Sequence, residues 1–298
     1  VALLVEAGRL DWDTRVAEVI PEFGNRGKEV ITLRHILSHS AALRQADRVE
    51  APSREAILEM IYDLSLDEGQ TPGLHAGYHA GGTWFVLGEV IKRVSGDPVE
   101  VFLASNVFEP LGMKGATLGL SAGGLPESFV PMWDTFKRDA DQKRIHPIFG
   151  TEAGLRMPRP GRSMIGPIRD LARFYEEMRR ILLEQSDFIS KKTLDEMMVP
   201  QRVKGKVDLT FGHPADFGLG FYLHPEKYKV GKVSYGYGRL ASEMSFGHSG
   251  AQSSCAFFDP PNDLVVAWVC DGMPGELRHQ RRARAINEAI YTDLGLDE

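Results

Sequence analysis

The sequence predicts a mixed α/β fold of the α+β kind, in which an antiparallel sheet is flanked by helices and lies beside a mostly helical lobe. Apolar residues recur at helical spacing in the first third of the chain and again after residue 167. Residues 244–258 and 264–270 contain the aromatic or β-branched residues typical of strands, and the sequence Asp-Pro-Pro-Asn-Asp joins them as in a β-hairpin. Because residues 264–270 lack polar alternation, we expect helices to cover both faces of the sheet.

The composition is that of an ordinary soluble globular protein: 298 residues, 43% hydrophobic and 26% charged. We expect one domain over residues 1–298, with a mostly helical lobe at 14–164 and a sheet-containing lobe at 165–298. The net charge of −6 does not attract nucleic acid, so no nucleic-acid partner is expected. The longest apolar run, residues 264–270, is far shorter than the about 18 residues of a membrane span. Nothing in the sequence requires a metal or an organic cofactor.

The first expected element is a helix over residues 1–8 that ends at Gly8, where glycine readily takes the left-handed conformation. No Ser, Thr, Asp or Asn caps its start, and the chain does not begin with Met. We therefore expect these residues to be the last turns of a longer helix in an N-terminally truncated chain. A targeting segment would lie in the missing part, so the cellular location stays open, as does the oligomeric state.

Short helices are expected next, and each has a recognisable start or end. Thr32 and Ser53 are placed to cap two of them, ahead of apolar residues at helical spacing. Residues 83–95 form a third helix, which Gly96 ends, and Pro98 begins another. Glycine and proline are frequent between residues 118 and 167, so we expect long loops there.

The sheet-containing part begins with a helix at Pro167. Its apolar stripe consists of Leu171, Phe174, Tyr175, Met178 and Ile181. Strands are expected at residues 217–223, 244–258 and 264–270. The last helix is expected at residues 276–294, and the side chains that should face the sheet are Leu277, Ile286, Ile290 and Leu294.

Three local patterns are candidates for chemistry: residues 77–82 (Gly-Tyr-His-Ala-Gly-Gly), 163–164 (Ser-Met) and 246–251 (Phe-Gly-His-Ser-Gly-Ala). The third does not fit the nucleophile elbow of an α/β-hydrolase, because Ala251 replaces a glycine and a strand follows instead of a helix. Two histidine pairs, His35 with His39 and His75 with His79, have the i, i+4 spacing of a zinc-binding helix, but no suitable glutamate accompanies them. We expect solvated or capping histidines there, and no zinc site.

The order of these patterns along the chain resembles that of the serine β-lactamase and penicillin-binding-protein superfamily. Residues 3–13 resemble the family's stretch that ends the nucleophile helix, residues 31–40 its next helix, and residues 108–113 a further landmark. The resemblance extends from residue 1 to about 290. It is closest to the subgroup of class C β-lactamases, family VIII carboxylesterases and D-amino-acid-specific peptidases. It implies a β-lactamase/transpeptidase-like fold with a cleft between the two lobes.

The resemblance also implies site residues. Tyr78 falls on the tyrosine of the family's Tyr-Ser-Asn element, and His248, Ser249 and Gly250 fall on its Lys-Thr-Gly element. Tyr78 and His248 would be catalytic, whereas Ser249, Gly250 and Ala251 would bind substrate, with the Ala251 N–H in the oxyanion hole. The third motif, Ser-x-x-Lys, is missing, because no serine is followed three residues later by lysine. By the family pattern it would lie about three helical turns before the first residue, so the chain as given is expected to be inactive.

The implied reaction is acyl transfer through an acyl-enzyme, in which Tyr78 transfers a proton. Tyr78 can act as a base at neutral pH only if a nearby cation stabilises its phenolate. Ala80 replaces the family's asparagine and His248 its lysine, which removes an amide and weakens the positive charge for a carboxylate. We therefore expect a carboxylesterase for small esters. A D-amino-acid peptidase, a β-lactamase-type amide hydrolase or a non-catalytic ligand-binding member stay alternatives, with a small-molecule ester or amide as partner. Ser163 is expected to be a turn or capping residue, and residues 38–40 are expected to be loop scaffolding near the cleft.

Overall fold

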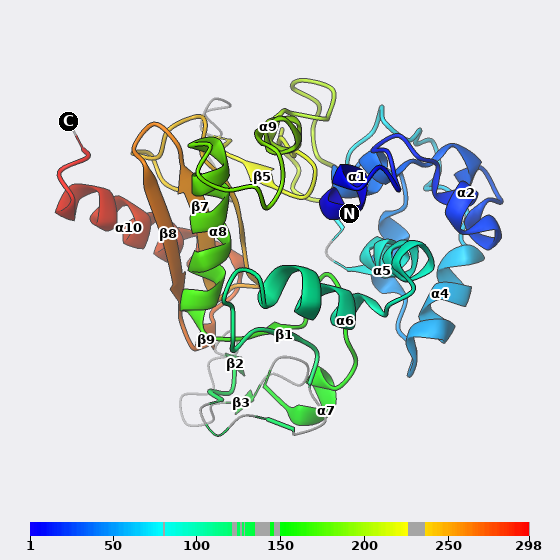
Figure 1. Cartoon of the computed structure of the whole chain (residues 1–298), viewed down its shortest axis with the longest axis horizontal. Coiled ribbons are helices and arrows are strands. Elements are labelled where there is room, and N and C mark those ends of the chain that lie inside the picture. The colour runs from blue at the N-terminus through cyan, green and yellow to red at the C-terminus, as the bar shows by residue number, and fades with distance from the viewer. Residues whose placement is uncertain are drawn as a thin grey trace.

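The structure, a computed structural model, describes residues 1–79, 81–120, 124, 125, 127, 129–134, 144, 145, 150–225 and 236–297. Figure 1 shows helices α1 to α5 on one side of the molecule and a sheet with helices α8 and α10 on the other. The expected mixed fold class, an antiparallel sheet flanked by helices together with a helical part, is confirmed. The lobe boundaries at residues 14–164 and 165–298 stay a prediction.

The main sheet is antiparallel and has the strand order β5-β6-β7-β8. The strands are β5 (Tyr222–Leu223), β6 (Phe246–Ser249), β7 (Ser254–Asp259) and β8 (Leu264–Val269). Asp259 pairs with Leu264 at the end of the β7–β8 hairpin, as the turn sequence predicts.

Helices cover both faces of this sheet, as the unbroken apolar character of residues 264–270 predicts. Helix α8 (Ile168–Leu182) lies on one face, where Tyr175 and Met178 share a core cluster with Phe258. Helix α10 (Glu276–Asp293) lies on the other face, where Tyr291 shares a core cluster with Phe257. Neighbouring residues of β7 thus enter opposite cores, because side chains alternate along a strand.

The helical part consists of short helices around a core of its own. They are α1 (Ala2–Glu6), α2 (Val16–Val19), α3 (Leu33–Leu37), α4 (Arg54–Tyr62), α5 (Gly82–Ser95) and α6 (Val99–Leu103), with the turns η1 (Pro21–Phe23), η2 (Lys28–Val30), η3 (Arg44–Arg48) and η4 (Ala104–Phe108). The expected caps are confirmed: Thr32 accepts a hydrogen bond from the His35 backbone N–H, and Ser53 accepts one from Ala56. Gly96 ends α5 at a φ of 92°.

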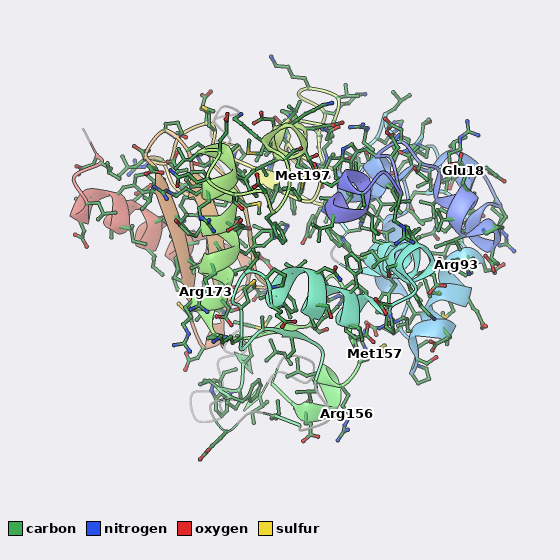
Figure 2. The ribbon with its side chains drawn as sticks, in the orientation of Figure 1. Glu18, Arg93, Arg156, Met157, Arg173 and Met197 are labelled. Atoms are coloured by element: carbon green, nitrogen blue, oxygen red, sulfur yellow. The ribbon has the colours of Figure 1, made fainter. Side chains whose placement is uncertain are left out.

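Helix α1 joins the two parts of the fold. Leu4 packs in a cluster with Ile91, whereas Leu3 also packs against the cluster between α8 and the sheet. The Glu6 carboxylate accepts a hydrogen bond of 2.6 Å from Ser190, which caps α9 (Lys191–Met198). Met197 of α9, labelled in Figure 2, packs against both the helical core and the sheet core.

Smaller elements link the segments on either side of residue 165. Strand β1 (Thr117–Leu118) pairs with β4 (Met164–Ile165), and β2 (Trp133–Asp134) pairs with β3 (Arg144–Ile145) and with β9 (Gly272–Met273). Helix α7 (Glu152–Leu155) is a single turn. The described residues of the expected loop region, 118–167, are mostly irregular, and its other residues lie outside the described part.

Two of the expected strands are wrong in extent. Residues 244–258 contain two strands, β6 and β7, because the chain reverses between them. In this reversal the Gly250 N–H donates to the Ser254 carbonyl, and Gln252 has a φ of 54°. In residues 217–223 only β5 is a strand, since the chain turns at Gly218 and Gly220. Glycine at position 220, with a φ of 92°, permits this turn.

The expected buried face of the last helix is wrong at its two ends, whereas Ile290 packs against the sheet cluster as expected. Leu277 and Leu294 are 64% and 57% exposed, whereas His279, Ala283, Asn287 and Tyr291 are buried. Asn287 tolerates burial because its Oδ1 accepts a hydrogen bond of 2.8 Å from the Trp268 indole. Within the described residues, no helix has the length and apolar character needed to cross a bilayer.

Candidate active site

A small pocket brings together residues that are far apart in the sequence. Its volume is about 170 Å³. The described residues that line it are His39, Tyr78, Trp84, Pro160, Gly161, Gly220 and His248. The structure therefore places Tyr78 and His248, the two residues expected to be catalytic, against one hollow. Their catalytic roles stay predictions.

Aromatic rings surround Tyr78. The centroid of its ring lies 4.7 Å from the ring of His39 and 5.8 Å from the ring of His248. Phe211 and Phe217 stack on it at 5.1 Å and 5.8 Å. The phenol is thus held in place by ring contacts from the helical part and from the segment that leads into the sheet.

Two aspartates fix the backbone of the Tyr78 turn. The Tyr78 N–H donates to Asp208 Oδ2 at 2.9 Å, and its carbonyl accepts from the Thr210 hydroxyl at 2.7 Å. Beyond the tyrosine, the N–H groups of Gly81 and Gly82 donate to Asp47 Oδ1 at 3.0 Å and 2.7 Å. Sequence reasoning missed both aspartates because they lie far from the turn along the chain. Ala80, where the family has asparagine, lies outside the described residues.

A buried ion pair connects the Tyr78 turn to the segment that carries His39. Arg202 Nη1 lies 2.8 Å from Asp208 Oδ2, and the two side chains are 2% and 0% exposed. The same guanidinium donates to the backbone carbonyls of Ser38 and His39, at 2.6 Å and 3.3 Å. Arg202 therefore holds the backbone of His39 directly and the backbone of Tyr78 through Asp208.

His39 lies at the centre of this arrangement and has a left-handed backbone, with a φ of 55°. Its Nδ1 is 3.2 Å from Nδ1 of His79, which is in turn 2.7 Å from the Thr83 hydroxyl. Burial lowers the pKa of His39 well below its usual value and lowers that of His79 to about 4. Both imidazoles are therefore neutral at pH 7. The sequence placed residues 38–40 near the cleft as loop scaffolding, and the structure shows in addition that His39 itself lines the pocket.

In each of the two histidine pairs, the first histidine accepts a hydrogen bond from a backbone N–H and the second is buried. His35 is a capping residue, because its Nδ1 accepts from the Thr32 N–H at 3.2 Å, and His75 accepts from the Thr71 N–H at 3.0 Å. For His39 and His79 the expectation of solvated or capping side chains is wrong, because both are buried. Among the described residues, no cluster of three or more His, Cys, Asp or Glu side chains is placed to hold a metal ion.

His248 lies on β6 and is half-buried. Its Nδ1 is 2.7 Å from the Ser249 carbonyl oxygen. A carbonyl only accepts hydrogen bonds, so Nδ1 carries the proton and Nε2 does not when the ring is neutral. Burial lowers the pKa of His248, which favours this neutral ring at pH 7.

The three residues expected to bind substrate follow His248 without lining the pocket described above. Ser249 lies opposite Cys255 in the β6–β7 register and hydrogen-bonds to its thiol. A Cβ at Gly250 would lie 2.1 Å from the Ser254 hydroxyl, so a larger residue there would require that side chain to rotate. Ala251 is exposed at the tip of the β6–β7 turn. Substrate binding by Ser249, Gly250 and Ala251 stays a prediction.

The Tyr78 phenol is protonated at pH 7. Burial is the main cause that raises its pKa, and the carboxylates of Asp47 and Glu276 raise it further, while Arg162 opposes them. The Arg162 guanidinium lies over the Tyr78 turn, since a Cβ at Gly81 would meet its Nε at 2.5 Å. The phenolate that the family mechanism calls for therefore needs more positive charge than Arg162 supplies in the described part of the chain.

Ser163, by contrast, is the structural residue that the sequence predicts. It is buried, and its hydroxyl accepts from the Arg159 N–H at 2.7 Å, which closes the turn before β4.

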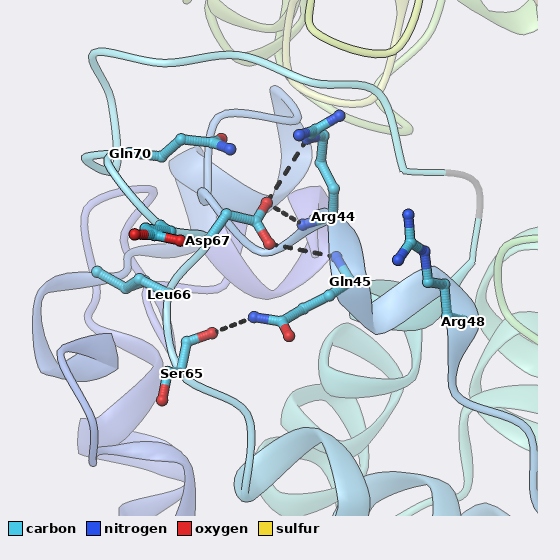
Figure 3. A pocket seen from close by; sticks show the side chains of 8 residues that line it. Arg44, Gln45, Arg48, Ser65, Leu66, Asp67 and Gln70 are labelled. Carbon is cyan, nitrogen blue, oxygen red and sulfur yellow. Dashed lines mark hydrogen bonds and ion pairs between the residues drawn. The ribbon is translucent and has the colours of Figure 1, made fainter.

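A larger hollow of about 540 Å³, shown in Figure 3, shares no lining residue with the Tyr78 pocket. Three of its lining residues already interact with one another, because Asp67 accepts from the backbone of Arg44 and Gln45 and forms an ion pair with the Arg44 guanidinium at 3.6 Å. We therefore place the candidate site at the smaller pocket.

The chain is similar to several known proteins. A "Putative D-alanyl-D-alanine carboxypeptidase" of Salmonella agona (strain SL483) is 21% identical over 286 residues, which cover 88% of this chain and 63% of that protein. A penicillin-binding protein homolog from Caulobacter crescentus superposes with a TM-score of 0.73 at 24% identity, covering 97% of this chain and 79% of that one. A family VIII carboxylesterase gives a TM-score of 0.73 at 24% identity, with coverages of 96% and 79%. These structures confirm the expected β-lactamase/transpeptidase-like fold.

The chain spans between 41% and 63% of the length of the first curated relatives that it matches. The family model described as Beta-lactamase matches residues 1–291, which is nearly the whole chain. This family consists of hydrolases of the β-lactamase and penicillin-binding-protein type. The order of the elements, the pocket between Tyr78 and His248 and this match agree, and the chain belongs to the beta-lactamase family.

Proposed function

We propose that this chain forms the substrate pocket of a serine carboxylesterase, which cleaves small esters through an acyl-enzyme. The observation that supports this proposal is that Tyr78 and His248 line one pocket together with neutral, aromatic side chains. The pocket, at about 170 Å³, is smaller than the roughly 300–1,000 Å³ of sites for drug-sized ligands. A short acyl group is the substrate that suits this size.

In the proposed reaction a serine hydroxyl attacks the ester carbonyl and a base takes its proton. Tyr78, protonated at pH 7, donates a proton to the departing alkoxide. Water then attacks the acyl-serine, the Tyr78 phenolate takes a proton from that water, and the protonated base returns its proton to the serine oxygen, which restores both groups. The Ala251 N–H contributes to the oxyanion hole, and Ser249 and Gly250 border the substrate. Residues 1–298 contain no Ser-x-x-Lys, so we place the acylated serine outside them and expect this stretch alone to be inactive.

The first test is the coding sequence before residue 1. A Ser-x-x-Lys within roughly 30 codons, a window that covers about three helical turns with margin, supports the esterase. An intact reading frame without the motif supports a member of the family that binds a ligand and does not turn it over.

The second test measures hydrolysis of ethyl acetate and ethyl butyrate by the complete gene product, because their alkoxide leaving groups need a proton and p-nitrophenolate does not. Tyr78→Phe is expected to lower kcat by about 10²–10⁴-fold, the usual contribution of a general acid or base. Tyr62→Phe is the matched control, because Tyr62 is half-buried on α4, where its ring packs on Phe23 instead of the pocket. Equal kcat values for the wild type and Tyr78→Phe would remove Tyr78 from the mechanism.

Amide hydrolysis is the second candidate, and the name of the Salmonella agona relative supports it. The discriminating measurement compares the p-nitrophenyl ester of D-alanine with its p-nitroanilide on the same enzyme. A carboxylesterase cleaves the ester and leaves the anilide nearly untouched. Comparable kcat/KM values for the two would favour a D-amino-acid peptidase.

A further inference from the structure

The described side chains that line the pocket carry no net charge at pH 7. Three of them can ionise: His39, Tyr78 and His248. Burial lowers the pKa of both imidazoles and raises that of the phenol, so the ionised form is disfavoured in each case. The other lining residues are Trp84, Pro160, Gly161 and Gly220. A ligand in this pocket therefore meets neutral groups on every described side.

His248 presents a hydrogen-bond acceptor to such a ligand. Its Nδ1–H donates to the Ser249 carbonyl at 2.7 Å, which leaves Nε2 as the ring nitrogen available to a ligand. The ring is half-buried, lines the pocket, and lies against the rings of Tyr78 and Phe217, with centroid distances of 5.8 Å and 6.2 Å. In the neutral ring Nε2 has a lone pair and no proton, so it accepts hydrogen bonds and repels other lone pairs.

The groups that face His248 do not hold an extra proton on it. They are Tyr78 from the turn before α5, His39 from the segment after α3, and Tyr175 of α8, whose hydroxyl hydrogen-bonds the His248 backbone. None of the three is an acid at pH 7, so no anion among them stabilises an imidazolium. Arg162 is the described cation that influences Tyr78, and its own charge also disfavours a second cation nearby.

We infer that His248 meets the substrate as a neutral acceptor, and that the pocket takes an uncharged acyl ester in preference to one whose acyl chain carries a carboxylate. A carboxylate would lose its hydration in the pocket, gain no cation from the described lining, and place its lone pairs against Nε2. The inference rests on the proposed function and adds to it a substrate class and a specificity-determining residue.

The test uses the complete gene product and two esters of similar size, p-nitrophenyl butyrate and the mono-p-nitrophenyl ester of succinic acid. The wild type is expected to favour the butyrate at least tenfold in kcat/KM at pH 7.5. His248→Lys is expected to reduce this preference at least tenfold, because it introduces a cation. His213→Lys is the matched control: His213 Nδ1 also bonds the next residue's carbonyl, at 2.8 Å, but His213 does not line the pocket. Its preference should equal that of the wild type.

The wild type alone gives a second measurement, which does not depend on the folding of a variant. Calorimetric titration with butyramide and with succinamate measures binding without catalysis. Succinamate is expected to bind more weakly than butyramide at pH 7.5 and to tighten, by up to tenfold per pH unit, as the pH falls and His248 takes up a proton. The affinity of butyramide should change little over the same range.

The outcomes separate the inference from the proposed function. If neither ester is hydrolysed but the binding preference and its pH dependence hold, the esterase proposal fails and the inference stands. Equal or tighter binding of succinamate at pH 7.5, or no binding of butyramide, overturns the inference. A carboxylate preference that disappears in Arg162→Gln would also overturn it and assign the charge recognition to Arg162.

Discussion

Replacing Asp208 by alanine tests the physical basis of the site most directly. The change leaves the Arg202 guanidinium, 2% exposed, without its carboxylate partner at 2.8 Å. It also removes the acceptor for the N–H groups of Tyr78, Thr210 and Phe211. Breaking a buried pair from one side costs about 3–5 kcal/mol, because the other charge stays buried and uncompensated. We expect the free energy of unfolding of Asp208→Ala to fall by about that amount.

The assay is urea denaturation of residues 1–298 at pH 7, followed by tryptophan fluorescence. Asp195→Ala is the matched control, since Asp195 forms an exposed pair with Lys191 at 2.7 Å, with side chains 42% and 47% exposed. Such pairs contribute about 0–1 kcal/mol, so this variant should unfold nearly like the wild type. If Asp208→Ala lost less than about 1 kcal/mol, the ion pair would not hold the two pocket segments together in the way argued above.

Three further results follow from the structure. The folded-state pKa of His79 is about 4, below the unfolded value of 6.5, so the unfolded state takes up protons first as the pH falls. The contribution of His79 to the free energy of unfolding should therefore be complete above pH 6.5 and decrease towards pH 4. Urea denaturation at each pH should show a less steep decrease for His79→Gln than for the wild type. The free energy of unfolding of Gly82→Ala should fall by about 1–3 kcal/mol in the same assay, because the new Cβ would lie 2.2 Å from the Ala46 carbonyl oxygen. The free energy of unfolding should fall by about 1–3 kcal/mol in Asn287→Ala and by less than about 0.5 kcal/mol in Leu277→Ala. A larger loss in Leu277→Ala than in Asn287→Ala would show that α10 buries the face that the sequence predicts.

Local sequence rules predicted the elements whose ends depend on neighbouring residues. Thr32 and Ser53 cap their helices, and Gly96 ends α5, because each acts on backbone groups only a few residues away. The stripe on α8 was also predictable, since five apolar residues at helical spacing must find cover, and the sheet supplies it. These features are decided within one or two helical turns of the chain.

The misassigned parts depend on partners that are distant in the sequence. Asn287 and His279 are polar, so a hydrophobicity pattern assigns them to the solvent side of α10. Asn287 is nevertheless buried, because its amide oxygen bonds the Trp268 indole on the neighbouring strand. The reversal after His248 had a similar cause, because a Gly-Ala-Gln-Ser sequence between two apolar stretches permits both a continuous strand and a tight turn. Only the pairing of β6 with β7 decides between them.

The same distinction applies to the site. Family motifs identified Tyr78 and His248, whose glycine-containing neighbours are characteristic, but the motifs do not contain the groups that hold these residues in place. Asp208 lies 130 residues from Tyr78 and still fixes its backbone N–H, while Arg202 reaches across to the His39 segment. A misplacement of about 1 Å at such a site can lower the rate strongly, and here the positions of the pocket residues depend on an ion pair that no motif contains. A relative could therefore keep Tyr78 and His248 and still lose its activity through a change at Arg202 or Asp208.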